Sequence, residues 1–154
     1  MTVSAQDRAD VIDACTRMMW SIDVHDWETF PSVFAPEVTL DYTRLWGGEP
    51  DRATPQDVTA AWSALFRGFS ATQHLLANHL VEVDGDRAVL TAVFQATHRG
   101  EDPFGGPLWT LGGTYRFGLV RIDGEWKIDE VEMTPTWAEG NKDVVAAARA
   151  GNHD

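Results

Sequence analysis

Residues 72–98, TQHLLANHLVEVDGDRAVLTAVFQATH, decide the fold. Apolar and polar side chains alternate on both sides of Asp84-Gly85, a pair that favours the two positive φ angles of a type I′ hairpin turn. Folding the chain about this turn brings residues 72–74 opposite residues 95–97. The same pattern recurs around Asp123-Gly124, so we predict antiparallel strands at 72–83, 87–98, 109–122 and 125–134, with a longer hairpin loop at 101–107.

Before residue 68 the hydrophobic spacing is that of helices. It predicts a helix at 6–22, a second at 27–34 that Pro36 ends, and a third with Thr54 as N-cap and Pro55 as first residue. We also expect a strand at 38–42, a loop at 46–52, an Ala-rich helix at 141–150 and a frayed end at 151–154. This order indicates an α+β fold, in which a curved antiparallel sheet wraps around three N-terminal helices as a cone-shaped barrel with an open mouth.

The composition is typical of a single domain spanning residues 1–154. Hydrophobic residues make up 44% of the chain, and 7 Trp and 7 Phe supply bulk for a core and a lined cavity. The formal net charge of −12 disfavours nucleic-acid and membrane partners. Because Cys15 is the only cysteine and the N-terminus is polar and acidic, we expect a reducing, cytoplasmic location. Phosphate-loop, dinucleotide and Ser-elbow motifs are missing, as is a close-spaced metal-ligand pair, so we expect no cofactor and no metal.

Asp23 is the most informative polar residue. At about 100° per residue it continues the apolar stripe of the first helix, on the same side as Ile12 and Met19. An ionised carboxylate buried there without a partner would cost several kcal/mol, on the order of the penalty for an isolated buried charge. Asp23 therefore either ends the helix at a solvated edge or pairs with a buried basic group.

His74 and His98 are the candidate partners. They stand near the start of one predicted strand and the end of the next, so the hairpin brings them to the same edge, as near neighbours if a bulge or register offset intervenes. Each histidine alone could be satisfied by backbone or water. One carboxylate and two imidazoles converging in an apolar pocket would form a general acid and base set.

Further residues are expected to line the same pocket. Tyr42 and Tyr115, the only tyrosines, fall on predicted inward faces, where a phenol either packs in the core or donates to a carbonyl or enolate oxygen. Alternation places Phe94 on the face of His98, and Asn78 and Leu80 on the face of His74, with His79 on the opposite face. Loop or mouth positions make three tryptophans candidates for contact with a flat substrate: Trp46, Trp109 and Trp137.

Four segments resemble a known family: WSIDVHDWETFPSVFAPEVTLDY (20–42), TQHLLAN (72–78), ATHRG (96–100) and GGTYRFGLVRIDGEWKI (112–128). Over residues 7–137 the chain is similar to the SnoaL-like domain of the nuclear transport factor 2-like superfamily, with scytalone dehydratases as the nearest pattern. The resemblance implies that Asp23 orients a catalytic histidine, that His74 and His98 are the imidazole pair, and that Tyr42 helps to hold a carbonyl-polarising water. Ile22 replaces a tyrosine of that pattern, and Tyr115 replaces its pocket asparagine.

These observations predict a cofactor-independent lyase or isomerase, a dehydratase or cyclase acting on a hydrophobic cyclic ketone or polyketide-like molecule. His74 would take a proton next to a carbonyl, His98 would protonate the departing hydroxyl, and Tyr42 or Tyr115 would stabilise the enolate. The alternative is a non-catalytic small-molecule-binding or partner-subunit protein that keeps the cone. An Asp23 far from both imidazoles, or a cavity filled by Trp and Phe, would favour it. We also expect a homo-oligomer, a dimer or trimer.

Overall fold

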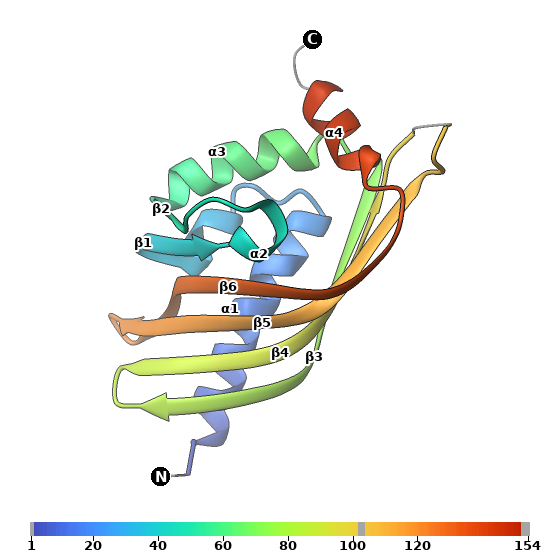
Figure 1. Ribbon diagram of the computed structural model, residues 1–154. Coiled ribbons are helices and arrows are strands. Elements are labelled where there is room, and N and C mark those ends of the chain that lie inside the picture. The colour runs from blue at the N-terminus through green and yellow to red at the C-terminus, as the bar shows by residue number, and fades with distance from the viewer. Residues whose placement is uncertain (1, 102–103, 152–154) are drawn as a thin grey trace.

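The computed structural model of the protein describes residues 2–101 and 104–151 and has an open, curved sheet with helices on its concave side (Figure 1). The sheet has six strands in the order β2-β1-β6-β5-β4-β3. These are β1 (Phe34–Asp41), β2 (Asp51–Ala53), β3 (Ala71–Asp84), β4 (Arg87–Arg99), β5 (Leu108–Ile122) and β6 (Glu125–Gly140). The predicted α+β class and curved sheet are confirmed, and β2 and β3 remain its two edges. The four long strands β3 to β6 pair antiparallel as predicted, whereas β1 runs parallel to β6, which makes the sheet mixed.

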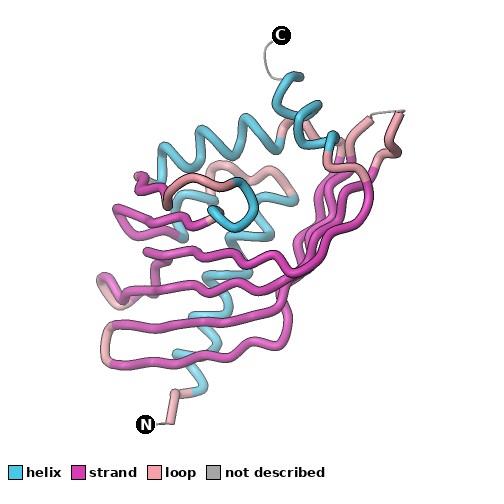
Figure 2. Tube along the Cα trace, in the orientation of Figure 1, coloured by secondary structure: helices cyan, strands magenta, loops and turns pink. Residues whose placement is uncertain are grey.

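The first helix, α1 (Ala5–Asp23), lies along the concave face of the sheet, as Figure 2 shows. It starts where the Ser4 hydroxyl accepts a hydrogen bond from the Asp7 N–H. Its apolar stripe, including Val11, Met18 and Ile22, is buried against the strands. Asp23 is its last residue, so the carboxylate stands at the end of the buried stripe, as the sequence predicts.

The remaining helices are the 3-10 helix η1 (Phe30–Val33), α2 (Thr43–Trp46), α3 (Pro55–Phe66) and α4 (Asp143–Ala150). They lie at different places over the concave side, with α3 across the top of the view and α4 at its right-hand end (Figure 1). Thr54 caps α3 and Pro55 is its first residue, which confirms that prediction. Of the described helices, none is long and apolar enough to cross a membrane.

The predicted helix at 27–34 is wrong. Only η1 forms there, and β1 already begins at Phe34 rather than at residue 38. Pro31 explains the difference, because it lies inside the predicted helix, lacks the N–H of a helical hydrogen bond and would clash with the carbonyl of Trp27. The predicted loop at 46–52 likewise contains the end of α2 and the start of β2. Parts of the expected loop at 101–107 and frayed end at 151–154 lie outside the described residues.

The two hairpin turns differ. Asp123 and Gly124 have φ angles of 51° and 82°, as a type I′ turn requires, which confirms the prediction. In the first hairpin Asp84 pairs with Arg87, so the turn residues are Gly85 and Asp86, one position later than predicted. Only Gly85 has a positive φ, 60°, which is the pattern of a type II′ turn.

A β-bulge in β3 changes which side chains face inward. The register with β4 shifts between Ala77 and Leu80, and Asn78 has a φ of 56°. One extra residue there exchanges the two faces of the strand. His79 therefore lies on the inner side, where Arg8 of α1 donates a hydrogen bond to its carbonyl, while Asn78 and Leu80 are exposed. The predicted placement of these three residues is wrong for this reason.

Candidate active site

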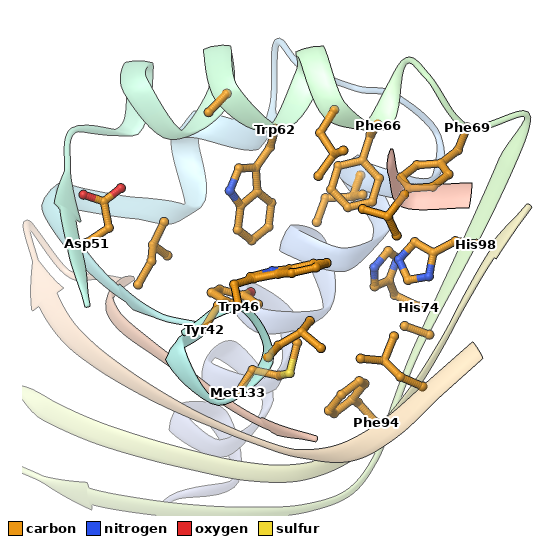
Figure 3. A pocket seen from close by; sticks show the side chains of 18 of the residues that line it. Tyr42, Trp46, Asp51, Trp62, Phe66, Phe69, His74, Phe94, His98 and Met133 are labelled. Carbon is orange, nitrogen blue, oxygen red and sulfur yellow. The ribbon is translucent and has the colours of Figure 1, made fainter. Parts of the chain in front are cut away.

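A pocket of about 630 Å³ opens on the concave side of the sheet. Its walls come from β1, the strands β3 to β6, and the helices α1, α2, α3 and α4, and most of the side chains that face it are apolar (Figure 3). Among these are Met19, Trp62, Phe66, Phe69 and Met133. An apolar cavity with a few polar groups is the common form of a small-molecule site.

The Asp23 carboxylate is held at the wall of this pocket by the start of β3. Its Oδ1 lies 2.6 Å from Nδ1 of His74 and accepts a hydrogen bond of 3.0 Å from the Thr72 hydroxyl. Its Oδ2 accepts a bond of 2.7 Å from the backbone N–H of His74. A carboxylate can only accept hydrogen bonds, so Nδ1 of His74 carries a proton, and in the neutral tautomer the lone pair is on Nε2. The expected pairing of Asp23 with His74 is present in the structure.

His98 comes from the neighbouring strand and is buried, with 7% of its surface exposed. Its Nδ1 lies 3.3 Å from the Trp109 carbonyl oxygen, which can only accept, so this nitrogen is the donor. Burial, and next the proximity of His74, lower the pKa of His98 to about 4. At neutral pH its ring is therefore uncharged, with an unprotonated Nε2.

The two imidazoles meet because of the strand register. His74 is paired with Ala96, and His98 with Thr72, so the histidines are diagonal neighbours on one face of the sheet. Their ring centroids lie 5.6 Å apart and their planes are nearly perpendicular. The register differs by one residue from the sequence estimate, in the direction that brings the pair together.

Two phenols face the same pocket from β5 and from the residue after β1. The hydroxyls of Tyr42 and Tyr115 lie 3.3 Å apart. Burial raises the pKa of Tyr115 to about 12, and burial with the neighbouring Tyr115 raises that of Tyr42 well above its usual value. Both phenols therefore stay protonated at neutral pH and are hydrogen-bond donors. Phe94 packs against Tyr115 with a centroid separation of 4.6 Å, on the predicted inner face.

Trp46 and Trp109 line the pocket as predicted, with ring centroids 6.3 Å apart. Trp137 and Asn78 do not, and these two predictions are wrong. Trp137 is 44% exposed and covers Gly112. Together with Leu75 and Val93 it lines a second groove. The register shift between Gly112 and Gly113 turns this end of β6 away from the mouth. Asn78 is directed outward by its own bulge.

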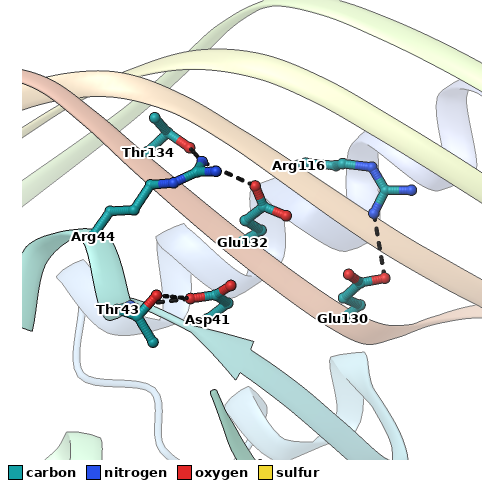
Figure 4. A network of polar contacts seen from close by, with 7 residues as sticks. All are labelled: Asp41, Thr43, Arg44, Arg116, Glu130, Glu132 and Thr134. Atoms are coloured by element: carbon teal, nitrogen blue, oxygen red, sulfur yellow. Dashed lines mark hydrogen bonds and ion pairs between the residues drawn. The ribbon is translucent and has the colours of Figure 1, made fainter. Parts of the chain in front are cut away.

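A polar network holds α2, and with it Trp46, at the pocket mouth (Figure 4). Asp41 Oδ1 accepts bonds of 2.6 and 3.1 Å from the hydroxyl and N–H of Thr43, and these bonds lower the pKa of Asp41. Arg44 donates to Glu132 at 3.1 Å and to Thr134, so it fixes α2 to β6. The short helix α2 is thus bound to the sheet at both β1 and β6.

Several residues at the site were not predicted as part of it. Thr72 could have been found, because it lies two residues before His74 and so shares its face. Trp62 and Phe66 lie on the apolar face of α3, which helical periodicity alone assigns to the core. Arg149 of α4 lines the pocket through the packing of a terminal helix, for which the sequence has no local signal. Within the described part of the chain no three His, Cys, Asp or Glu residues are placed to hold a metal ion.

The comparisons with known proteins identify the family. A SnoaL-like domain matches residues 3–132. The chain belongs to this family. The dehydratase cfoI of Aspergillus candidus is 34% identical over 139 residues, which cover 82% of this chain and 80% of the relative. The family and dehydratase relatives inferred from sequence motifs are thereby confirmed.

Several solved structures share the fold of this SnoaL-like protein. Kfla4162 of Kribbella flavida superposes with a TM-score of 0.85 and 29% identity, over 94% of this chain and 97% of the other. A Novosphingobium aromaticivorans protein proposed to be a scytalone dehydratase has a TM-score of 0.71 and 21% identity, over 88% and 87% of the chains. At that identity the second likeness concerns the fold alone.

Proposed function

We propose that the protein is a cofactor-independent dehydratase that removes water from a β-hydroxy ketone with an apolar cyclic or polyketide-like skeleton. The observation that carries the proposal is the Asp23–His74 pair, with an Oδ1 to Nδ1 distance of 2.6 Å, at the wall of an apolar pocket. A dehydratase-type activity is also supported by the relative cfoI, which is named as a dehydratase.

His74 is the base in the first step. Its Nδ1–H is held by Asp23, so Nε2 can take a proton from the carbon next to the substrate carbonyl. The electron pair of the broken C–H bond moves into an enolate. Asp23 stabilises the imidazolium that forms, because the two charges lie in contact within a largely buried site.

Tyr42 and Tyr115 stabilise the enolate oxygen. Both phenols are protonated at neutral pH, and their hydroxyls are close enough to act on one oxygen, directly or through a water. Charge develops on that oxygen only as the proton leaves, so the donors favour the transition state over the bound ketone.

The enolate then collapses to a carbon–carbon double bond and expels the β-hydroxyl. We assign the proton that converts the hydroxyl to water to the His74 imidazolium, which returns to its starting state. The sequence-based assignment of this step to His98 is less consistent with its chemistry, because its pKa is about 4 and its Nδ1 proton is used by the Trp109 carbonyl. We propose instead that His98 Nε2 accepts a hydrogen bond from the leaving hydroxyl and orients it.

The non-catalytic alternative is less well supported. Its two expected signs were an Asp23 remote from both imidazoles and a cavity filled with aromatic side chains. The carboxylate instead contacts His74, and the pocket has room for a bicyclic molecule, within the range of roughly 300–1,000 Å³ that is usual for ligand sites. Isomerisation and aldol cyclisation use the same proton abstraction, and product analysis separates them from dehydration.

The test is turnover of a bicyclic β-hydroxy ketone of the hydroxytetralone type, which gives a fluorescent naphthol on losing water. His74→Ala should lower kcat by about 10² or more, the usual contribution of a positioned base. The matched control is His25→Asn, because His25 is exposed, lies outside the pocket and has a φ of 57°, which asparagine tolerates. Dehydration at an equal rate by wild type and His74→Ala would contradict the proposal.

A further inference from the structure

The pocket mouth carries a guanidinium group that has no acidic partner among the described residues. Arg149, in the last turn of α4, lines the pocket, and among the described residues none forms an ion pair with it. The chain has 24 acidic and 12 basic side chains, so carboxylates are in excess. Six of the nine other arginines pair with described acidic side chains: Arg17, Arg44, Arg52, Arg87, Arg116 and Arg121.

An aromatic ring holds Arg149 in place. The guanidinium carbon lies 4.8 Å from the centroid of the Trp46 ring, and the Lys142 ammonium lies 5.2 Å from the same ring. A cation over an aromatic ring is engaged through its face. The N–H groups at the edge of the guanidinium plane therefore remain available, and their fork geometry fits the two oxygens of a carboxylate.

Packing of α4 fixes where this group stands. A Cβ atom at Gly68 would collide with the backbone of Ala148, and Gly100 is close to Val144, so the helix rests directly on the chain next to Phe69 and on the end of β4. This is the end of the pocket where His98 lies. The helix can approach this closely because neither Gly68 nor Gly100 has a side chain.

The mouth is consequently polarised in charge. The Trp46 ring connects Arg149 to Trp109, whose ring centroid is 5.1 Å from that of His98. The acidic pocket residues Glu49 and Asp51 follow α2, and Figure 3 shows Asp51 at the opposite end of the pocket from His98. An anionic substrate group is thus attracted to the Arg149 side of the mouth, away from Glu49 and Asp51.

We infer that Arg149 recognises a carboxylate on the cyclic substrate, with Lys142 adding a second positive charge. The inference rests on the proposed function, because it assigns the substrate class for the same pocket: a cyclic hydroxy ketone that also bears a carboxylate. Trp46 provides the flat surface on which both the cation and a substrate ring can stack.

Binding of two matched probes tests this role without any chemical step. Naphthoate and the neutral naphthamide have the same shape, and their dissociation constants can be measured by calorimetry at low salt. The wild type should bind naphthoate about tenfold more tightly, as expected for one charge-assisted pair at a solvated mouth. Arg149→Gln should abolish this preference, and Arg149→Lys should retain part of it because the charge remains while the fork is lost.

Arg67→Gln is the charge-matched control, since Arg67 is exposed, lies next to Gly68 and does not line the pocket. It should keep the full preference. Equal binding of both probes by the wild type would overturn the inference. An equal loss of the naphthoate preference in Arg67→Gln would also overturn it, because the effect would then come from diffuse charge. So would a retained preference with lower thermal stability in Arg149→Gln, because Arg149 would then act only on the helix dipole.

The same assay separates this inference from the proposed function. His74→Ala should keep the preference for naphthoate, because the assay requires no base. If the preference depends on Arg149 but no β-hydroxy ketone is dehydrated, the proposed function fails and the carboxylate site remains.

Discussion

Replacing Asp23 by asparagine should remove most of the activity while leaving the fold intact. The carboxylate accepts from the His74 ring and the Thr72 hydroxyl through Oδ1, and from the His74 backbone through Oδ2. An amide has only one oxygen. If that oxygen takes the backbone bond, the amide NH₂ faces Nδ1 of His74, which must then accept, and the proton moves to Nε2 where the base is needed. If it takes the ring bond, the NH₂ opposes the backbone N–H.

The expected loss follows from these two effects. The variant has the wrong His74 tautomer, or a broken backbone contact, and in both cases the imidazolium of the transition state lacks its counter-charge. We expect kcat to fall by about 10² to 10⁴, or about 3 to 5 kcal/mol of activation free energy. The free energy of unfolding should fall by about 1 to 3 kcal/mol, the cost of an unsatisfied buried polar group.

The assay is naphthol formation from a hydroxytetralone, with urea unfolding measured in parallel. Asp13→Asn is the control, because Asp13 lies on the exposed side of the same helix and pairs only with Arg17. Thr72→Val should have an intermediate effect of about tenfold, since it removes one bond and keeps the charge. A folded Asp23→Asn protein with kcat within about threefold of wild type would refute the reasoning.

Three other outcomes are expected. Burial lowers the pKa of His98 to about 4, so the free energy of unfolding decreases as the pH falls from about 6.5 to 4, by up to about 3 kcal/mol. His98→Asn should remove this part of the pH dependence in urea titrations. Tyr42→Phe and Tyr115→Phe should each lower kcat about tenfold, and the double variant should lose little more than the larger single effect; additive losses would mean that the phenols act separately. We propose that two copies pair through the outer face of the sheet, where Trp137 and Val93 are exposed, so Trp137→Arg should give monomers in light scattering; a monomeric wild type would contradict this.

Much of the fold follows from local patterns in the sequence. The turn at Asp123-Gly124 requires two positive φ angles, and the alternation on either side of it gives the strands. The apolar stripe of α1 leads directly to Asp23, since the period of a helix fixes which side a residue faces. Features set by one residue and its immediate neighbours were therefore predictable.

The errors arise where a single residue changes the phase of a strand or where distant segments pack. The bulge at Asn78 depends on a left-handed backbone conformation that asparagine tolerates but does not require. The turn of Trp137 away from the pocket depends on an irregular register at Gly112. The contribution of Arg149 depends on how α4 folds back over Gly68. Such features are decided by tertiary contacts, which periodicity does not encode.

The bulge in β3 divides the strand into two segments that contact different parts of the molecule. Residues before Asn78 direct Thr72 to Asp23 and His74 to the pocket, and residues after it present His79 and Val81 to α1 and the core. Substrate preference and thermal stability can accordingly evolve on different halves of the same strand. Deletion of Asn78 would remove the bulge and leave the same side chains facing inward on both halves, whereas a strand of full length without the bulge would have one half inverted. Related sequences should therefore either keep the bulge or lack this residue.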